Sequence, residues 1–274
     1  MSGSHVDASG CYGDRSVRID VLESPEGSLW VVCLFHGVYG VASLEEGNKY
    51  GELARRLSER GITTCLVETS RDVRNRSDFP DRTDWAVAAF AGKKYGQELF
   101  DHMSGLSKVS EIFPDGRICL WGFSLGGIDS LMIAGGVVEP VSDLGLDVPP
   151  VPLDRIGALV ISGSGDTLRS DSSIKTSLPV LSSICEAEVL REACRNVEVS
   201  SVDFFYGSED DTFDEPSCRR LFDLIPVSNR HFTVIDGADH PFRSLDGISS
   251  TKPLDLMVET VSSHLQGHPG DWPR

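Results

Sequence analysis

The sequence predicts an α/β fold built on a doubly wound, mostly parallel sheet. Three observations support this prediction. Segments with the pattern of β-strands alternate with segments of helical length from residue 17 almost to the C-terminus. Several of these strands are continuous apolar runs, which is typical of strands covered on both faces. With 274 residues, 40% of them hydrophobic, the chain is long enough to form one large domain with a sizeable core.

The first half of the chain contains the clearest strand and helix patterns. Residues 50–60 repeat apolar side chains at helical spacing, and Gly61 is expected to end that helix. Residues 84–109 are also helical in pattern, with a break expected near Gly92 or Gly96. Apolar and polar residues alternate over 17–22, which predicts a half-buried strand. Apolar runs predict three further strands in this half, at 29–35, 62–67 and 117–121.

The second half continues the alternation, with strands expected at 156–161, 202–206 and 232–235 and a closing helix at 254–265. Residues 168–197 interrupt it and contain a helical segment around 182–195. We expect this insert to form a small cap over the edge of the sheet where ligands bind. Residues 1–16 and 266–274 are expected to be flexible termini, which leaves a single domain over 17–265.

The charge of the chain excludes some classes of partner. Lysine and arginine number 25 and aspartate and glutamate 42, so the formal charge is 25 − 42 = −17. Such a surface repels nucleic-acid phosphates and anionic membranes, so neither is expected as a partner. No apolar run approaches the length of a membrane span and no secretory leader is visible, so a cytoplasmic location is expected. The oligomeric state stays open, a dimer included.

The cysteines suggest neither a disulfide framework nor a metal site. There are seven of them, an odd number, and no pair has the C-x-x-C spacing of zinc ligands. Cys33, Cys65 and Cys119 lie within apolar strand-like runs, where a free cysteine behaves as a small hydrophobic residue. A reducing compartment and the absence of a bound metal are therefore expected.

The motif Gly122-Phe123-Ser124-Leu125-Gly126-Gly127 carries the strongest functional signal. It stands between an apolar strand-like run and a helix-like run, and Gly-x-Ser-x-Gly in that context is the pattern of a nucleophile elbow. The serine is expected on a strained, tight turn, with glycines where strand and helix pack closely. The alternative interpretation is an ordinary turn of small residues. The elbow predicts that Ser124 is a nucleophile and that the Leu125 N–H stabilises an oxyanion.

A serine nucleophile needs a base and an acid, which in this chain order follow it. His240 comes directly after the last apolar strand and is the predicted base, although a solvated loop histidine is the alternative. The predicted acid is Asp210, which follows the preceding strand, with Asp211 as a close second and Asp166 as a weaker candidate. In so acidic a chain, this run of carboxylates can also be a solvated turn.

The loop at residues 35–40 is expected to supply the second oxyanion donor. It follows an early central strand, and Gly37 would let the backbone come close to the substrate. The N–H of Val38, or else that of Tyr39, would point at the developing negative charge, while His36 is expected to hold the loop.

Three blocks of the chain resemble the α/β-hydrolase superfamily, in the branch of small carboxylesterases, monoacylglycerol-lipase-like enzymes and cinnamoyl esterases. They are His36-Gly37 with residues 50–61, the elbow at 122–127, and residues 207–210 with 237–240. The resemblance implies a serine esterase with a Ser124–His240–Asp210 triad, a small-molecule ester as substrate and no cofactor. The chain departs from many relatives after the strand that ends at Val67. Those relatives have an Asp and then a Gly-His-Gly-like turn, whereas this chain has the arginine-containing segment 68–76.

The substrate is the least determined part of the sequence-based prediction. Tyr39, Phe123 and Phe242 flank the predicted chemistry and are expected to line an apolar acyl pocket, with core packing as the alternative. Three arginines at 71, 74 and 76 can receive a substrate carboxylate or simply face solvent. A thioesterase or acyltransferase acting on carrier-bound acyl groups, and a non-enzymatic receptor with the same fold, remain alternatives.

Overall fold

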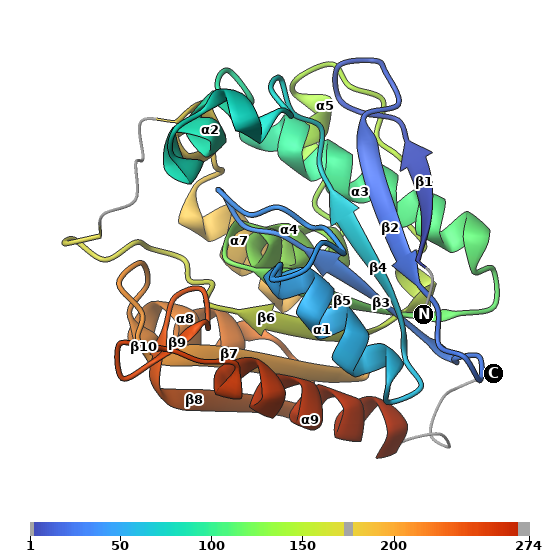
Figure 1. Ribbon diagram of the computed structural model, residues 1–274, viewed down its shortest axis with the longest axis vertical. Coiled ribbons are helices and arrows are strands. Elements are labelled where there is room, and N and C mark those ends of the chain that lie inside the picture. Colours follow the sequence, from blue (N-terminus) through green and yellow to red (C-terminus); the bar gives the residue numbers. More distant parts are fainter. Residues whose placement is uncertain (1–2, 173–177, 268–274) are drawn as a thin grey trace.

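The computed structural model describes residues 3–172 and 178–267, and they form one mixed sheet with helices on both faces (Figure 1). The strand order is β1-β2-β4-β3-β5-β6-β7-β8-β9-β10. The six strands from β4 to β8 in this order are parallel, and antiparallel strands flank them on both sides. The predicted open, mostly parallel sheet is therefore confirmed.

The strands are β1 Ser4–Ala8, β2 Val17–Leu22, β3 Trp30–Phe35, β4 Thr63–Glu68, β5 Arg117–Phe123, β6 Ile156–Ser162, β7 Ser201–Glu209, β8 Arg230–Asp239, β9 Ser244–Leu245 and β10 Ile248–Ser249.

Two hydrophobic clusters separate the sheet from its helices. One face is covered by α1 and α9, and the other mainly by α3, α4, α7 and α8 (Figure 1). The central strands β3, β4 and β6 are buried along their whole length, as their continuous apolar runs predict. The helices are α1 Lys49–Ser58, α2 Arg82–Ala89, α3 Tyr95–Ile112, α4 Leu125–Ala134, α5 Glu139–Ser142, α6 Pro179–Ser182, α7 Ala187–Arg195, α8 Glu215–Leu224 and α9 Lys252–Gly267, with 3-10 turns at Arg76–Asp78 and Leu153–Arg155.

Local sequence signals set the ends of several helices. The Asn48 side chain accepts the N–H of Tyr50 (2.9 Å) and so caps α1, while Gly61 adopts a φ of +79° just after its end. The expected break in the long helical segment is also present. It separates α2 from α3, and Gly92 turns the chain there with a φ of +78°.

The N-terminus differs from its prediction. Residues 4–8 form strand β1, which pairs with β2 in antiparallel register, so this part of 1–16 is not a flexible tail. The segment is held because Val6 and Ala8 pack on the main hydrophobic cluster and the Cys11 N–H donates to Asp101 Oδ1 at 2.8 Å. At the other end, residues 266–267 belong to α9, whereas the rest of the expected tail lies outside the described residues.

The described part of the insert at 168–197 does not cap the site. Its helix α6 contacts α3, and α7 contacts α4 and α8, so both belong to the helical layer on one face of the sheet. Asp166 links α7 to α8, because it forms ion pairs with Arg191 of α7 (2.5 Å) and with Arg220 of α8 (2.6 Å). Residues 173–177 of the insert lie outside the described part of the chain.

Candidate active site

Ser124 lies at the turn between β5 and α4. Its φ and ψ are 54° and −117°, a strained combination for a residue with a side chain, as the elbow motif predicts. Hydrogen bonds on both sides hold the turn: the Ser124 N–H donates to the Ser162 carbonyl at 2.9 Å, and Ser164 Oγ donates to the Ser124 carbonyl at 2.7 Å. The neighbouring strand β6 and its following loop therefore fix the serine in place.

The motif glycines are required by close backbone packing. A Cβ at Gly122 would lie 2.1 Å from the Gly126 carbonyl oxygen, and one at Gly126 would lie 2.5 Å from the Phe35 carbonyl oxygen. The first contact brings the strand against the helix, and the second brings the helix against the end of β3. The spacing in the motif thus reflects steric exclusion at two positions.

His240 and Asp210 meet at the carboxyl ends of β8 and β7. His240 Nδ1 and Asp210 Oδ2 are 2.8 Å apart, and the carboxylate accepts the ring N–H, which leaves Nε2 as an acceptor. Asp210 Oδ1 in turn accepts the N–H groups of Thr212 (2.8 Å) and Phe213 (2.9 Å). Asp210 is 1% exposed, so these donors hold a buried carboxylate in one orientation.

The other two candidate acids are placed differently. Asp211 is solvent-exposed, and its carboxylate accepts the hydroxyl of Thr212. Asp166 is engaged by Arg191 and Arg220, away from His240. Among the three, the structure therefore brings Asp210 to the histidine.

The loop after β3 comes directly against Ser124. A Cβ on Gly37 would lie 2.9 Å from Ser124 Cβ, so only glycine permits this approach. The Gly40 N–H donates to the Gly37 carbonyl (2.8 Å) in a turn that holds Tyr39 at a φ of +67°. Val38 lies in this turn, and Leu125 is the first residue of α4, where backbone N–H groups have no partner within the helix. Leu125 thus follows Ser124 directly in the chain, and Val38 follows Gly37, the residue whose backbone packs against Ser124.

His36 anchors the loop at residues 37–40 through its side chain, as expected. Its Nε2 accepts the Thr69 N–H at 3.2 Å, so the ring proton is on Nδ1, which donates to the Gly37 carbonyl at 3.0 Å. The side chain is completely buried, and burial lowers the pKa of its imidazole to about 4. A neutral histidine therefore joins the end of β4 to the candidate oxyanion loop.

Arg71 and Glu68 form a second brace for the same loop. Arg71 Nε pairs with Glu68 Oε1 (2.9 Å), and Nη2 donates to the Gly40 carbonyl (2.7 Å). Glu68 Oε2 accepts the Ala42 N–H at 2.7 Å. Although burial raises the pKa of the Glu68 carboxyl, the Arg71 guanidinium outweighs that effect and lowers it. The pair is thus ionised and ties the loop to β4 at two points.

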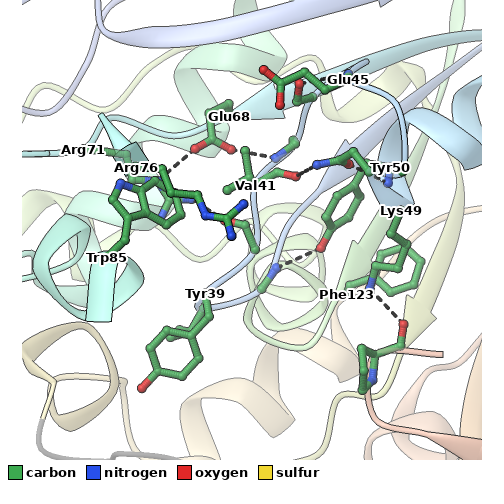
Figure 2. Close-up of a pocket in the computed structure, with 18 of the residues that line it drawn as sticks. Tyr39, Val41, Glu45, Lys49, Tyr50, Glu68, Arg71, Arg76, Trp85 and Phe123 are labelled. Atoms are coloured by element: carbon green, nitrogen blue, oxygen red, sulfur yellow. Dashed lines mark hydrogen bonds and ion pairs between the residues drawn. The ribbon is translucent and has the colours of Figure 1, made fainter. Parts of the chain in front are cut away.

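One cavity of about 760 Å³ has Ser124 and His240 in its wall. Most of its remaining lining comes from residues 37–50 and from the segment between Glu68 and α2 (Figure 2). Arg18 and Asp20 of β2, Phe123, Pro241 and Arg243 complete it. Tyr39 and Phe123 line it, as predicted for a substrate pocket. Phe242 does not: it is 0% exposed and packs edge-on against Phe123 in the core, with ring centroids 6.2 Å apart. The prediction for Phe242 is therefore wrong, because its turn directs the ring inward and anchors the His240 loop.

Solved structures resemble the chain over nearly its whole length, whereas no protein-family model and no curated protein matches it. A soluble variant of monoglyceride lipase from Saccharomyces cerevisiae has a TM-score of 0.66 at 13% identity, covering 99% of this chain and 96% of that one. The esterase domain of a Rhodothermus marinus protein gives 0.63 at 15%, covering 96% and 98%. Est1E from Butyrivibrio proteoclasticus, solved with ferulic acid, gives 0.61 at 13%, covering 96% and 98%.

The chain has the α/β-hydrolase fold. The fold predicted from the sequence is thus confirmed, and the Ser124 turn, the loop after β3 and the Asp210–His240 pair all lie at the carboxyl edge of its sheet. At this level of identity the structural likeness establishes the fold, and the chemistry has to be argued from the residues themselves.

Two groups of side chains in the described residues approach the spacing of metal ligands. In the first, His36, Glu98 and His102, both ring nitrogens of His36 already have partners, and Lys93 Nζ lies 2.5 Å from a Glu98 oxygen. The Lys93 ammonium group therefore supplies the positive charge beside Glu98 that a metal ion would otherwise supply. The second, Asp203 with His231 and His264, lies at the amino-terminal ends of β7 and β8, on the opposite edge of the sheet from Ser124.

Sequence reasoning missed several residues of the pocket. Glu68, Trp85 and Lys49 line it, and Lys49 Nζ lies 3.9 Å from the centre of the Phe123 ring. The one available signal was the departure from the family pattern at residues 68–76, where three arginines follow a buried strand. None of the described helices combines the length and apolar character that a membrane crossing requires.

Proposed function

We propose that this α/β-hydrolase-fold protein is a serine esterase that cleaves small carboxylic esters through an acyl-enzyme intermediate. The observation that carries the proposal is that Ser124, on its strained turn, and His240 line one cavity, with the buried Asp210 bonded to His240 Nδ1 behind it. The esterases and lipase among the structural neighbours are in accord with it.

The first half of the reaction acylates Ser124. Its hydroxyl oxygen attacks the ester carbonyl carbon and forms the new C–O bond, while His240 Nε2 takes the hydroxyl proton. The carbonyl oxygen becomes an oxyanion, stabilised by the N–H groups of Leu125 and Val38. The bond to the leaving alcohol then breaks, and the imidazolium returns its proton to the alcohol oxygen. Asp210 keeps the imidazole in the required tautomer and stabilises its charged form.

The second half repeats these steps with water. His240 Nε2 takes a proton from a water molecule, whose oxygen attacks the acyl carbon. The oxyanion forms again at the same two N–H groups. The bond to Ser124 Oγ breaks, and the proton on His240 returns to that oxygen, which releases the carboxylic acid and restores the resting state.

The replacement Ser124→Ala tests the proposal. We expect turnover of short p-nitrophenyl esters to fall by at least about 10³-fold with an unchanged melting temperature, because only the nucleophile is removed. Ser142→Ala, an exposed serine of α5, is the matched control and should keep full activity. A fluorophosphonate probe should label the wild-type protein at Ser124 and leave Ser124→Ala unlabelled.

Undiminished turnover in Ser124→Ala would refute the mechanism. If folded wild-type protein neither hydrolyses esters nor reacts with the probe, a non-enzymatic role is indicated instead. The same assay with a thioester and an added alcohol separates ester hydrolysis from the thioesterase and acyltransferase alternatives by the products formed.

A further inference from the structure

The cavity that contains Ser124 has a charge balance opposite to that of the whole protein. Six arginines or lysines line it against four acidic residues, whereas the chain as a whole has 25 against 42. Two of the four acids, Glu45 and Glu46, are solvent-exposed, and a third, Asp20, is engaged by His5 and by the Leu44 N–H. The lining as a whole therefore carries more positive than negative groups, within a strongly acidic molecule.

Four of these cations form an arginine cluster, defined here as Arg18, Arg71, Arg74 and Arg76. All four line the cavity, and three of them follow the end of β4 within eight residues. Burial lowers the pKa of the Arg74 guanidinium; the Glu68 carboxylate opposes this effect, and the positive charges of Arg18 and Arg71 add to it. Like charges gathered in this way are costly unless an anion compensates them.

The compensation comes from Glu68, while Arg74 donates a hydrogen bond to the Ser16 carbonyl. Within residues 3–172 and 178–267, the Arg71–Glu68 pair is the one ion pair that this cluster makes. Arg71 is only 6% exposed, and its buried Nη1 atom has no hydrogen-bond partner among those residues. An unsatisfied guanidinium nitrogen at a cavity wall is a donor for which a ligand oxygen is the natural acceptor.

Arg76 is placed to meet such a ligand. Figure 2 shows its guanidinium group directed toward the middle of the cavity, in the space between Trp85 and Tyr50. Arg76 lies in the 3-10 turn after β4, is solvent-exposed, and makes no ion pair or side-chain hydrogen bond within the described part of the chain. The planar five-donor fork of an arginine suits carboxylate and phosphate oxygens.

We propose that the arginine cluster is an anion subsite, and that the substrate is an ester carrying a carboxylate or a phosphate on the part remote from the reacting carbonyl. Arg76 is the specificity-determining contact, and Arg71 contributes from the buried wall. This inference rests on the proposed esterase function, because it places the charged end of the substrate in the same cavity whose wall contains Ser124.

The first experiment compares matched esters. The p-nitrophenyl half-ester of adipate is assayed beside a neutral isostere in which an isopropyl group replaces the carboxylate, together with a phosphate-bearing analogue and a pair charged on the alcohol side. We expect wild-type kcat/KM to favour a charged ester, and Arg76→Glu to reduce the charged-to-neutral ratio about tenfold. The ratio should also fall as salt is added.

Arg60→Glu is the matched control. Arg60 is exposed beyond the end of α1, at the opposite edge of the sheet from the pocket, and its replacement changes the net charge by the same amount. This variant should keep the wild-type ratio. If both variants lower the ratio equally, the effect belongs to the overall charge and the subsite is refuted. The preferred analogue decides between carboxylate and phosphate.

A second experiment does not depend on turnover. Binding of adipate monoester and of inorganic phosphate to Ser124→Ala is measured by calorimetry, with and without Arg76→Glu. We expect the second replacement to weaken anion binding about tenfold. Neutral-ester hydrolysis without any anion preference or binding would overturn the subsite and leave the esterase proposal standing, whereas anion binding without hydrolysis of any ester would overturn the esterase proposal.

Discussion

The two sides of the cavity are built by different means. The nucleophile side, with Ser124, Asp210 and His240, consists of short turns at the ends of β5, β7 and β8, held by backbone hydrogen bonds and steric exclusion. The arginine side, from Glu68 to Arg76, depends on charged side chains: the buried Arg71–Glu68 ion pair joins residues three apart, and both side chains bond to the distant loop at Gly40 and Ala42. The proposed chemistry on the first side thus depends on backbone geometry at the strand ends, and the proposed anion contacts on the second side depend on charged side chains.

The largest effect is expected on the nucleophile side. Replacing Asp210 by Asn should reduce kcat about 10³- to 10⁴-fold, because the amide cannot stabilise the imidazolium or select its tautomer. Asp211→Asn is the neighbouring control and should stay within a few-fold of wild type, since its side chain is exposed. Both are measured by steady-state kinetics and melting temperature. Equal losses in the two variants would remove Asp210 from its proposed role.

The next effect concerns the stability of the junction between the two sides, where His36 binds Thr69. The imidazole of His36 has a folded-state pKa of about 4 because of its burial, against an ordinary value of 6.5. As the pH falls, the unfolded chain takes up this proton first, so stability is complete above about 6.5 and is lost progressively down to about 4. Wild-type protein should lose about 3 kcal/mol of unfolding free energy from this group over that window.

The replacement His36→Gln isolates this contribution. The variant keeps an acceptor for the Thr69 N–H but cannot be protonated, so its stability should depend less on pH between 6.5 and 4. Denaturant unfolding at a series of pH values measures the difference from wild type. Parallel wild-type and His36→Gln curves would contradict the assignment.

The smallest effect is expected for Arg71→Lys. Lysine keeps the charge but cannot reach both the Glu68 carboxylate and the Gly40 carbonyl, which Arg71 contacts through separate nitrogens. We expect kcat/KM to fall about five- to tenfold and stability to fall by about 1 kcal/mol. Arg60→Lys should be neutral. If Arg71→Lys has full activity, the arginine side does not position the oxyanion loop, and the contrast between the two sides loses its basis.

Predictions from the sequence succeeded where a short segment contains its own physical reason. Continuous apolar runs located the central strands, and Gly61 ended α1 where it was expected. The elbow motif predicted a strained Ser124 between strand and helix, which its positive φ bears out. In each case the deciding interaction is steric or hydrophobic and lies within a few residues.

Predictions failed where distant segments decide. Phe242 follows His240 in sequence, yet its ring turns into the core because Phe123 and its neighbours leave an apolar site for it. The insert at 168–197 looked like a cap, but Asp166 and the face of α4 draw α7 into the helical layer. Strand β1 forms because β2 offers it a free edge.

By itself, the sequence determined the fold class, the elbow, and the order of serine, acid and histidine, because alternating apolar patterns and excluded side chains act locally. Tertiary structure alone decided which carboxylate meets His240, that Arg71 braces the loop beside Ser124, and that four arginines share its cavity. The physical reason is that hydrogen bonds and charge pairs need atoms within about 3–4 Å of one another. Only the folded chain brings such distant residues that close.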